Sequence, residues 1–124
     1  MNRVFLISVL LEEMQDDDIE YHDVISWSYS NINSKNVISL TEEELIAIIN
    51  KTSIFDIINE ENKSMIGPWE DDTICDASIV SAIYNKLILY SKNTFDSLVS
   101  EFLMKLIQLF QYAIAYKKHV YFLF

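Results

Sequence analysis

Apolar residues recur at three- and four-residue intervals along most of this chain of 124 residues, which is the spacing of helices with one buried face. The intervals predict six helices, over residues 3–14, 19–33, 42–50, a short stretch from Ser53, about 74–90 and about 95–114. Thr41 and Glu44 have the spacing of a capping box at the start of the third helix. Sheets need turn-forming residues at each hairpin, yet Gly67 and Pro68 are the only glycine and proline. The pattern therefore predicts an all-α protein.

The two C-terminal helices define the expected architecture. Residues 74–90 carry few polar side chains, and a helix that is apolar almost all round is one that other helices surround. A short connection leads to Thr94, which we expect to cap the last helix, and it makes 74–90 and 95–114 antiparallel neighbours. The apolar ending, residues 119–124, is expected to pack rather than float free. We therefore expect a single domain over residues 1–124, a helical bundle around a central hydrophobic helix.

Composition narrows the classes of function. The chain is 51% hydrophobic, which excludes disorder caused by low hydrophobicity, and its formal net charge is −10. Binding to nucleic acid or to an anionic membrane needs clustered Lys and Arg, so the charge argues against both. Seven acids and no Lys or Arg lie between Glu12 and Asp23, where we expect a solvated loop and the first turn of a helix. Lys105 and Gln108 interrupt the apolar stretch 102–116, so no membrane span is predicted.

Candidate chemistry is sparse. His22, Cys75 and His119 are far apart in sequence and lack the spacing of metal ligands. A lone cysteine cannot form an intramolecular disulfide, which fits a reducing cytosol. We expect no enzyme activity, no cofactor and no metal, with a catalytic Cys75 near a helix N-terminus as an open alternative. Trp69 lies in a polar loop and is either a plug over the core or an exposed anchor for a binding partner.

The C-terminal half carries a resemblance to a known family. Asp76-Ala77 precede an apolar helix over 79–89, and Phe95, Leu98 and the run 102–107 follow. With the start Met1-Asn2-Arg3, an apolar helix and an acidic patch, this order resembles the small Bcl-2-like host-defence proteins of poxviruses. The resemblance implies a Bcl-2-like bundle and a viral protein in the cytoplasm of the infected host cell. It also implies modulation of host innate immune signalling, in the NF-kappaB and interferon pathways, by binding host signalling proteins.

Other functions stay open under the same resemblance. Cellular Bcl-2 proteins carry an Asn-Trp-Gly-Arg motif whose arginine pairs with an aspartate of the pro-apoptotic BH3 helix. Here acids follow Trp69, and Lys86 is the nearby base. Because like charges repel at an interface, sequestration of BH3 motifs by an anti-apoptotic protein is the alternative rather than the preferred function. A Bcl-2-fold dimer without a functional BH3 groove, or a helical module that is purely structural, are further alternatives.

The resemblance also implies binding residues. Several relatives form homodimers through their first and sixth helices, which here would use Val4, Ile7, Leu10, Phe95, Val99 and Phe102. The candidate residues for binding other proteins are Trp69, Lys86, Ile49 and Ile83. The expected partners are host signalling or apoptosis-regulating proteins and a second copy of the chain.

Overall fold

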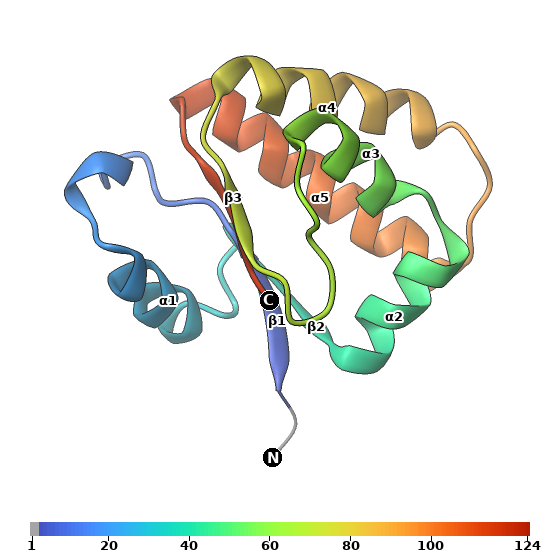
Figure 1. Cartoon of the computed structure of the whole chain (residues 1–124), viewed down its shortest axis with the longest axis horizontal. Coiled ribbons are helices and arrows are strands. Elements are labelled where there is room, and N and C mark those ends of the chain that lie inside the picture. Colours follow the sequence, from blue (N-terminus) through green and yellow to red (C-terminus); the bar gives the residue numbers. More distant parts are fainter. Residues whose placement is uncertain (1–2) are drawn as a thin grey trace.

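The computed structural model describes residues 3–124 and shows a four-stranded antiparallel sheet with helices on both faces (Figure 1). The strands are β1 (Val4–Ser8), β2 (Val37–Thr41), β3 (Asp72–Ile74) and β4 (Val120–Leu123), in the spatial order β2-β1-β4-β3. The helices are the 3-10 helix η1 (Asp16–Asp18), α1 (Tyr21–Ser30), α2 (Glu42–Lys51), α3 (Ile54–Asn62), α4 (Ala77–Tyr90) and α5 (Ser97–Tyr116). The prediction of an all-α, Bcl-2-like bundle is therefore wrong, and the fold is α/β. Met1 and Asn2, which begin the resemblance, lie outside the described residues.

The two ends of the described chain form the centre of the sheet. β1 and β4 pair antiparallel, with Ile7 opposite Phe122 and Ser8 opposite Tyr121. Helices cover both faces of these strands, so inward and outward side chains are both buried and each strand is a continuous apolar run. Periodicity cannot distinguish a short run of this kind from a buried helix. This explains why a helix was wrongly predicted over residues 3–14.

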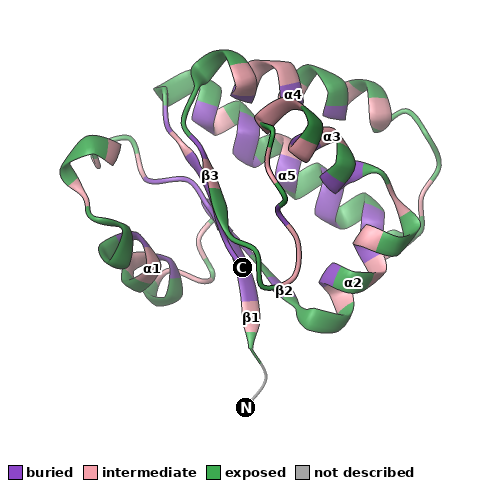
Figure 2. Ribbon diagram, viewed as in Figure 1, coloured by how far each residue is buried: buried purple, intermediate pink, exposed green. Residues whose placement is uncertain are grey.

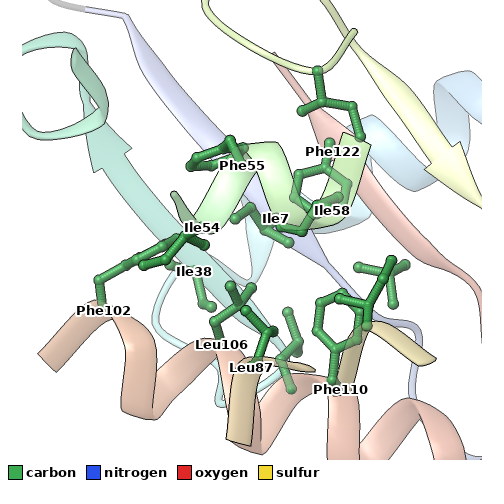
Figure 3. Packing of buried hydrophobic residues seen from close by; sticks show 14 of the residues in the cluster. Ile7, Ile38, Ile54, Phe55, Ile58, Leu87, Phe102, Leu106, Phe110 and Phe122 are labelled. Carbon is green, nitrogen blue, oxygen red and sulfur yellow. The ribbon is translucent and has the colours of Figure 1, made fainter. Parts of the chain in front are cut away.

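Side chains of the sheet alternate between two apolar clusters. Phe5 and Ile7 of β1 face the layer that contains α2 to α5, and Phe122 of β4 joins them. Figure 3 shows Ile7 and Phe122 packed with residues of the helices in this layer. Leu6 faces the opposite way, toward α1, where it packs in a smaller cluster with Val24. The sheet is therefore the middle of three layers, with α1 and the short η1 on one side (Figure 1).

α4 is not the surrounded central helix that the sequence predicts. Residues 72–74 form β3, and the helix begins after Asp76, whose carboxylate accepts a hydrogen bond from the backbone N–H of Ser78 at 2.8 Å. Ile83 and Leu87 are fully buried, whereas Leu89 is 64% exposed. Figure 2 shows that α4 carries buried, intermediate and exposed residues in turn along its length. α4 contacts α3 and α5 on its inner side and is open to solvent on its outer side. Some of its many apolar residues make these inner contacts, and others are exposed on the outer side.

α5 lies beside α4, as the short connection predicts, and runs in the opposite direction (Figure 1). Asp96, rather than Thr94, caps α5 by accepting a hydrogen bond from the backbone N–H of Val99 at 2.9 Å. By length and composition alone, this 20-residue helix could cross a membrane. Phe102 and Phe110 are nevertheless buried in the core of this fold (Figure 3). Packing inside the domain accounts for its apolar stripe.

A matched pair of substitutions tests the placement of α4. Leu87→Ala should lower the free energy of unfolding by about 2–5 kcal/mol, because it leaves a cavity in the core. Leu89→Ala removes the same atoms from an exposed position two residues later and should change it by less than about 0.5 kcal/mol. Urea unfolding followed by circular dichroism measures both. Equal, large losses would mean that α4 is surrounded on all sides after all.

Candidate functional site

Carboxylates are concentrated in two segments of the chain. Seven lie between Glu12 and Asp23 and four between Glu70 and Asp76, and neither segment contains Lys or Arg. All of these side chains except Asp16 are exposed. The first segment follows β1 and leads into α1, and the second contains β3 at one edge of the sheet (Figure 1). We call these two segments, residues 12–23 and 70–76, the acidic face.

Direct contacts bring the two segments together. The Tyr21 hydroxyl at the start of α1 donates a hydrogen bond to Asp71 Oδ2 at 2.5 Å, just before β3. Burial, this hydrogen bond and the charges of Asp71 and Asp72 raise the pKa of Tyr21 well above its ordinary value. Burial also raises the pKa of the Cys75 thiol, and the charges of Asp16 and Asp72 raise it further. Because carboxylates of both segments act on the same thiol, the two segments form one negative surface.

Asp16 is the one acid of this surface that turns inward. Its side chain is 8% exposed, and its Oδ1 accepts a hydrogen bond from the Tyr121 hydroxyl at 2.7 Å. Its Oδ2 accepts a longer one, 3.4 Å, from the backbone N–H of His119. Burial and the hydrogen bond to Asp16 raise the pKa of Tyr121 well above its ordinary value. Asp17 and Asp18 are exposed, so the inward Asp16 fixes a loop that presents its neighbours to solvent.

Trp69 lies directly before the acids of the second segment and is 57% exposed. Its φ of 67° is in the left-handed region, a conformation that costs a bulky residue about 1–3 kcal/mol. The Arg3 guanidinium lies 4.4 Å from the centre of the indole ring, and the Phe5 ring meets the indole edge-on at 5.5 Å. The indole is therefore held in place against β1 while more than half of the residue is exposed to solvent.

The six residues expected at a dimer interface do not form one exposed face. Four of them are buried in the domain, namely Ile7, Leu10, Val99 and Phe102. Val4 and Phe95 are half-buried, and they pack against the two different apolar clusters.

The four residues expected to bind other proteins are also separated in the structure. Ile83 is buried, Ile49 is half-buried, and both pack in the cluster on the α2 to α5 side of the sheet. Lys86 is on α4, where its Nζ lies 2.5 Å from Glu61 Oε1. Trp69 is the member of this set that adjoins the acidic face.

One cluster among residues 3–124 has ligand atoms close enough to hold a metal ion. Glu20, His22 and Asp23 are all exposed, and their nearest polar atoms lie within 4.8 Å of one another. His22 Nδ1 faces Glu20 at 3.4 Å, and its Nε2 faces Asp23 at 3.4 Å. The two carboxylates therefore approach opposite edges of the imidazole instead of converging with one nitrogen on a common centre.

Comparison with known proteins gives one consistent family. Residues 5–124 match the family model described as "DMP12: DNA-mimic protein". The chain is 30% identical over 106 residues to the DNA mimic protein DMP12 of Neisseria meningitidis serogroup B, and the alignment covers 85% of each chain. It is also similar to the solved structure of a Neisseria DNA mimic protein DMP12, with 29% identity, a TM-score of 0.75 and full coverage of both chains.

These matches overturn the poxvirus Bcl-2-like resemblance. Modulation of host innate immune signalling and sequestration of BH3 motifs are wrong as functions, and so are host signalling or apoptosis-regulating proteins as partners. The resemblance depended on a surrounded central helix over 74–90, whereas Ile74 ends the strand β3, α4 begins at Ala77, and the outer side of α4 is exposed.

The acidic residues are the candidate functional residues that motif searches miss. Their signal is present in the sequence as a net charge of −10 and two segments without Lys or Arg. This charge argues against nucleic acid as a ligand, but it does not argue against proteins that themselves bind nucleic acid.

The two tyrosines predict a loss of stability in alkali. Their pKa is raised in the folded chain, so above an ordinary tyrosine pKa of about 10 the unfolded chain ionises them and the folded chain does not. The free energy of unfolding should therefore fall as the pH rises from about 9 to about 11. In Tyr21→Phe/Tyr121→Phe the fall should be shallower, as measured by urea unfolding at each pH. Parallel pH profiles for the two proteins would contradict the hydrogen bonds to Asp71 and Asp16.

Proposed function

The chain belongs to the DMP12 family of DNA-mimic proteins, and on this basis we propose that its acidic face binds the DNA-contacting surface of a basic DNA-binding protein in place of DNA. The observation that carries the proposal is the acidic face itself, eleven carboxylates in two adjoining segments without Lys or Arg. Proteins that bind DNA neutralise phosphates with clustered Lys and Arg. Carboxylates accept the same charge-assisted hydrogen bonds from these side chains, including the bidentate ones of arginine.

The distribution of ion pairs supports this assignment. Lys51 pairs with Asp96 at 2.9 Å, and Lys86 with Glu61 at 2.5 Å, both within the layer of α2 to α5. Lys105 pairs with Glu101 at 3.3 Å in the same layer. Among the ion pairs of residues 3–124, those that involve the acidic face use only histidine. Its exposed carboxylates can therefore pair with the cations of another protein.

We propose further that the chain acts by binding and not by catalysis. Cys75 was the nucleophile that an enzymatic alternative required. A cysteine attacks as the thiolate, and both burial and the surrounding carboxylates raise the pKa of this thiol. The acidic face therefore disfavours the reactive form of the one cysteine.

Trp69 is the proposed apolar anchor of the same surface. It directly precedes Glu70, and a partner that covers Glu70 to Asp72 lies next to the exposed indole. Aromatic residues in this setting often contribute more to binding than the charges around them, because the charges lose hydration as the contact forms. The contacts with Arg3 and Phe5 hold the ring in place before binding, which lowers the entropy lost on association.

Charge neutralisation with a matched control tests the proposed function. The test variant is Glu12→Gln/Glu13→Gln/Asp17→Asn/Asp18→Asn, and the control is Glu42→Gln/Glu43→Gln/Asp56→Asn/Glu60→Gln on α2 and α3. All eight positions are exposed, and both variants change the net charge equally. At about 0.2–1 kcal/mol per exposed ion pair, the test variant should bind roughly tenfold more weakly or worse, and the control much less so.

The partner for this measurement comes from proteins that high salt elutes from a duplex-DNA column loaded with bacterial lysate. Those retained by the immobilised chain are purified, and displacement of labelled duplex DNA from them gives the affinity. Binding that does not compete with DNA, or equal losses in the two variants, would contradict the proposed function.

Trp69→Ala should weaken the same interaction by about tenfold or more, since a buried tryptophan at an interface contributes about 2 kcal/mol or more. Leu89→Ala on α4 removes an exposed apolar side chain away from the acidic face and should leave the affinity unchanged. Thermal unfolding of both variants separates loss of binding from loss of fold. Unchanged affinity in folded Trp69→Ala would remove the indole from the binding surface.

A further inference from the structure

We propose that Lys118 is a positioning residue whose buried ammonium holds the acidic loop, residues 12–18, in the conformation that the partner recognises. The inference rests on the proposed function, because it explains how the crowded acids of this loop keep one arrangement before binding. Lys118 follows the left-handed Lys117 that ends α5 and is only 6% exposed. Its Nζ donates a hydrogen bond to the backbone carbonyl of Met14, in the middle of the loop.

The surroundings of this ammonium make the contact unusual. A lysine is rarely this buried unless it is paired with a carboxylate. Among residues 3–124, no carboxylate lies within ion-pair distance, 4.0 Å, of its Nζ. The carbonyl of Met14 is therefore its direct partner. A positive charge placed under an acidic loop opposes the mutual repulsion of its carboxylates.

Lys118 is one of four groups in the C-terminal part of the chain that hold the loop, and the His119 backbone N–H, which donates to Asp16 at 3.4 Å, is another. The Tyr112 hydroxyl accepts a hydrogen bond from the backbone N–H of Glu12 at 2.8 Å, and the Tyr121 hydroxyl donates one to Asp16 at 2.7 Å. The loop is thus held at alternate residues 12, 14 and 16. Glu13, Asp17 and Asp18, which lie between and after these points, are exposed.

This arrangement has a consequence for affinity. Apart from the single turn of η1, the loop has no helix or strand to order it. Fixing one residue of a free backbone costs about 1–2 kcal/mol of conformational entropy, and a partner that bound a loose loop would bear that cost. A loop that is ordered before binding presents its carboxylates without this entropy cost.

The sign of the effect separates positioning from electrostatics. Lys118→Met removes one positive charge, so the net charge changes from −10 to −11. If the loop acted through charge alone, a basic partner would bind this variant more tightly. If Lys118 positions the loop, the variant binds more weakly although it is more acidic.

The adjacent Lys117 supplies a matched control, because it is exposed and Lys117→Met makes the same change in charge. Lys118→Met should bind the DNA-binding partner roughly tenfold more weakly than the unchanged chain, because binding must then order one or two residues of the loop. It should also show faster amide hydrogen exchange in residues 11–18 and an unreduced slope of log Kd against log salt. Lys117→Met should bind as tightly as the unchanged chain or more tightly, with unchanged exchange.

Tyr121→Phe keeps the charge and removes the hydrogen bond to Asp16, so it tests the same loop if Lys118→Met does not fold. It should also bind more weakly and exchange faster in residues 11–18. Binding of Lys118→Met that equals that of Lys117→Met, binding of Tyr121→Phe that equals that of the unchanged chain, or unchanged exchange in the loop, would overturn the positioning role. The exchange experiment uses the free chain, so it still tests the ordering of the loop if neutralising Glu12, Glu13, Asp17 and Asp18 shows that the proposed function is wrong.

Discussion

The pairing of β1 with β4 is the constraint on which the rest of the structure depends. It joins the two ends of the described chain at the centre of the sheet, and both faces of the pair are buried. Because the strands are antiparallel, the end of β1 lies beside the start of β4, with Ser8 opposite Tyr121. After the end of β1 the chain continues into the acidic loop, and Lys118 lies two residues before the start of β4. Both are therefore at the same end of the strand pair. One strand pairing therefore brings together groups that are more than 100 residues apart in sequence.

The charge of the chain is tolerated because it is segregated from the core and divided between two regions. A high net charge destabilises a compact state through self-repulsion. In the layer of α2 to α5, lysines pair with several of the acids, as Lys51 does with Asp96. On the acidic face the acids other than Asp16 are exposed to water, which screens them. Tyr21 donates a hydrogen bond to the exposed Asp71, and Tyr121 and the His119 backbone donate to the inward Asp16. The repulsion that remains there is the property that a basic partner would relieve.

Local sequence was sufficient to predict a helix where the helix has its own capping residues and one buried face. The Thr41 capping box is confirmed, with Oγ1 accepting from the backbone N–H of Glu44 at 3.1 Å and the Glu44 carboxylate accepting from Thr41 at 2.9 Å. α2 follows from it within one residue of the predicted end. The predicted start of α4 was wrong because Ile74 and Cys75 continue the apolar pattern of the helix toward the N-terminus. In the structure, Ile74 belongs to β3 and the backbone stays extended as far as Asp76. Capping and periodicity are properties of a few neighbouring residues, whereas strand formation depends on a partner elsewhere in the chain.

The sequence by itself determined that the chain has enough apolar residues for a buried core, several amphipathic helices, and a large excess of negative charge in two segments. The tertiary structure alone decided that residues 4–8 and 120–123 are strands, since an apolar run becomes a strand only when a second one pairs with it. It also decided that Glu12 to Asp23 and Glu70 to Asp76 lie side by side, because the sheet sets which distant segments meet. An acidic segment on its own is a solvated surface. Two of them held together on one fold make the surface that we propose as the binding face.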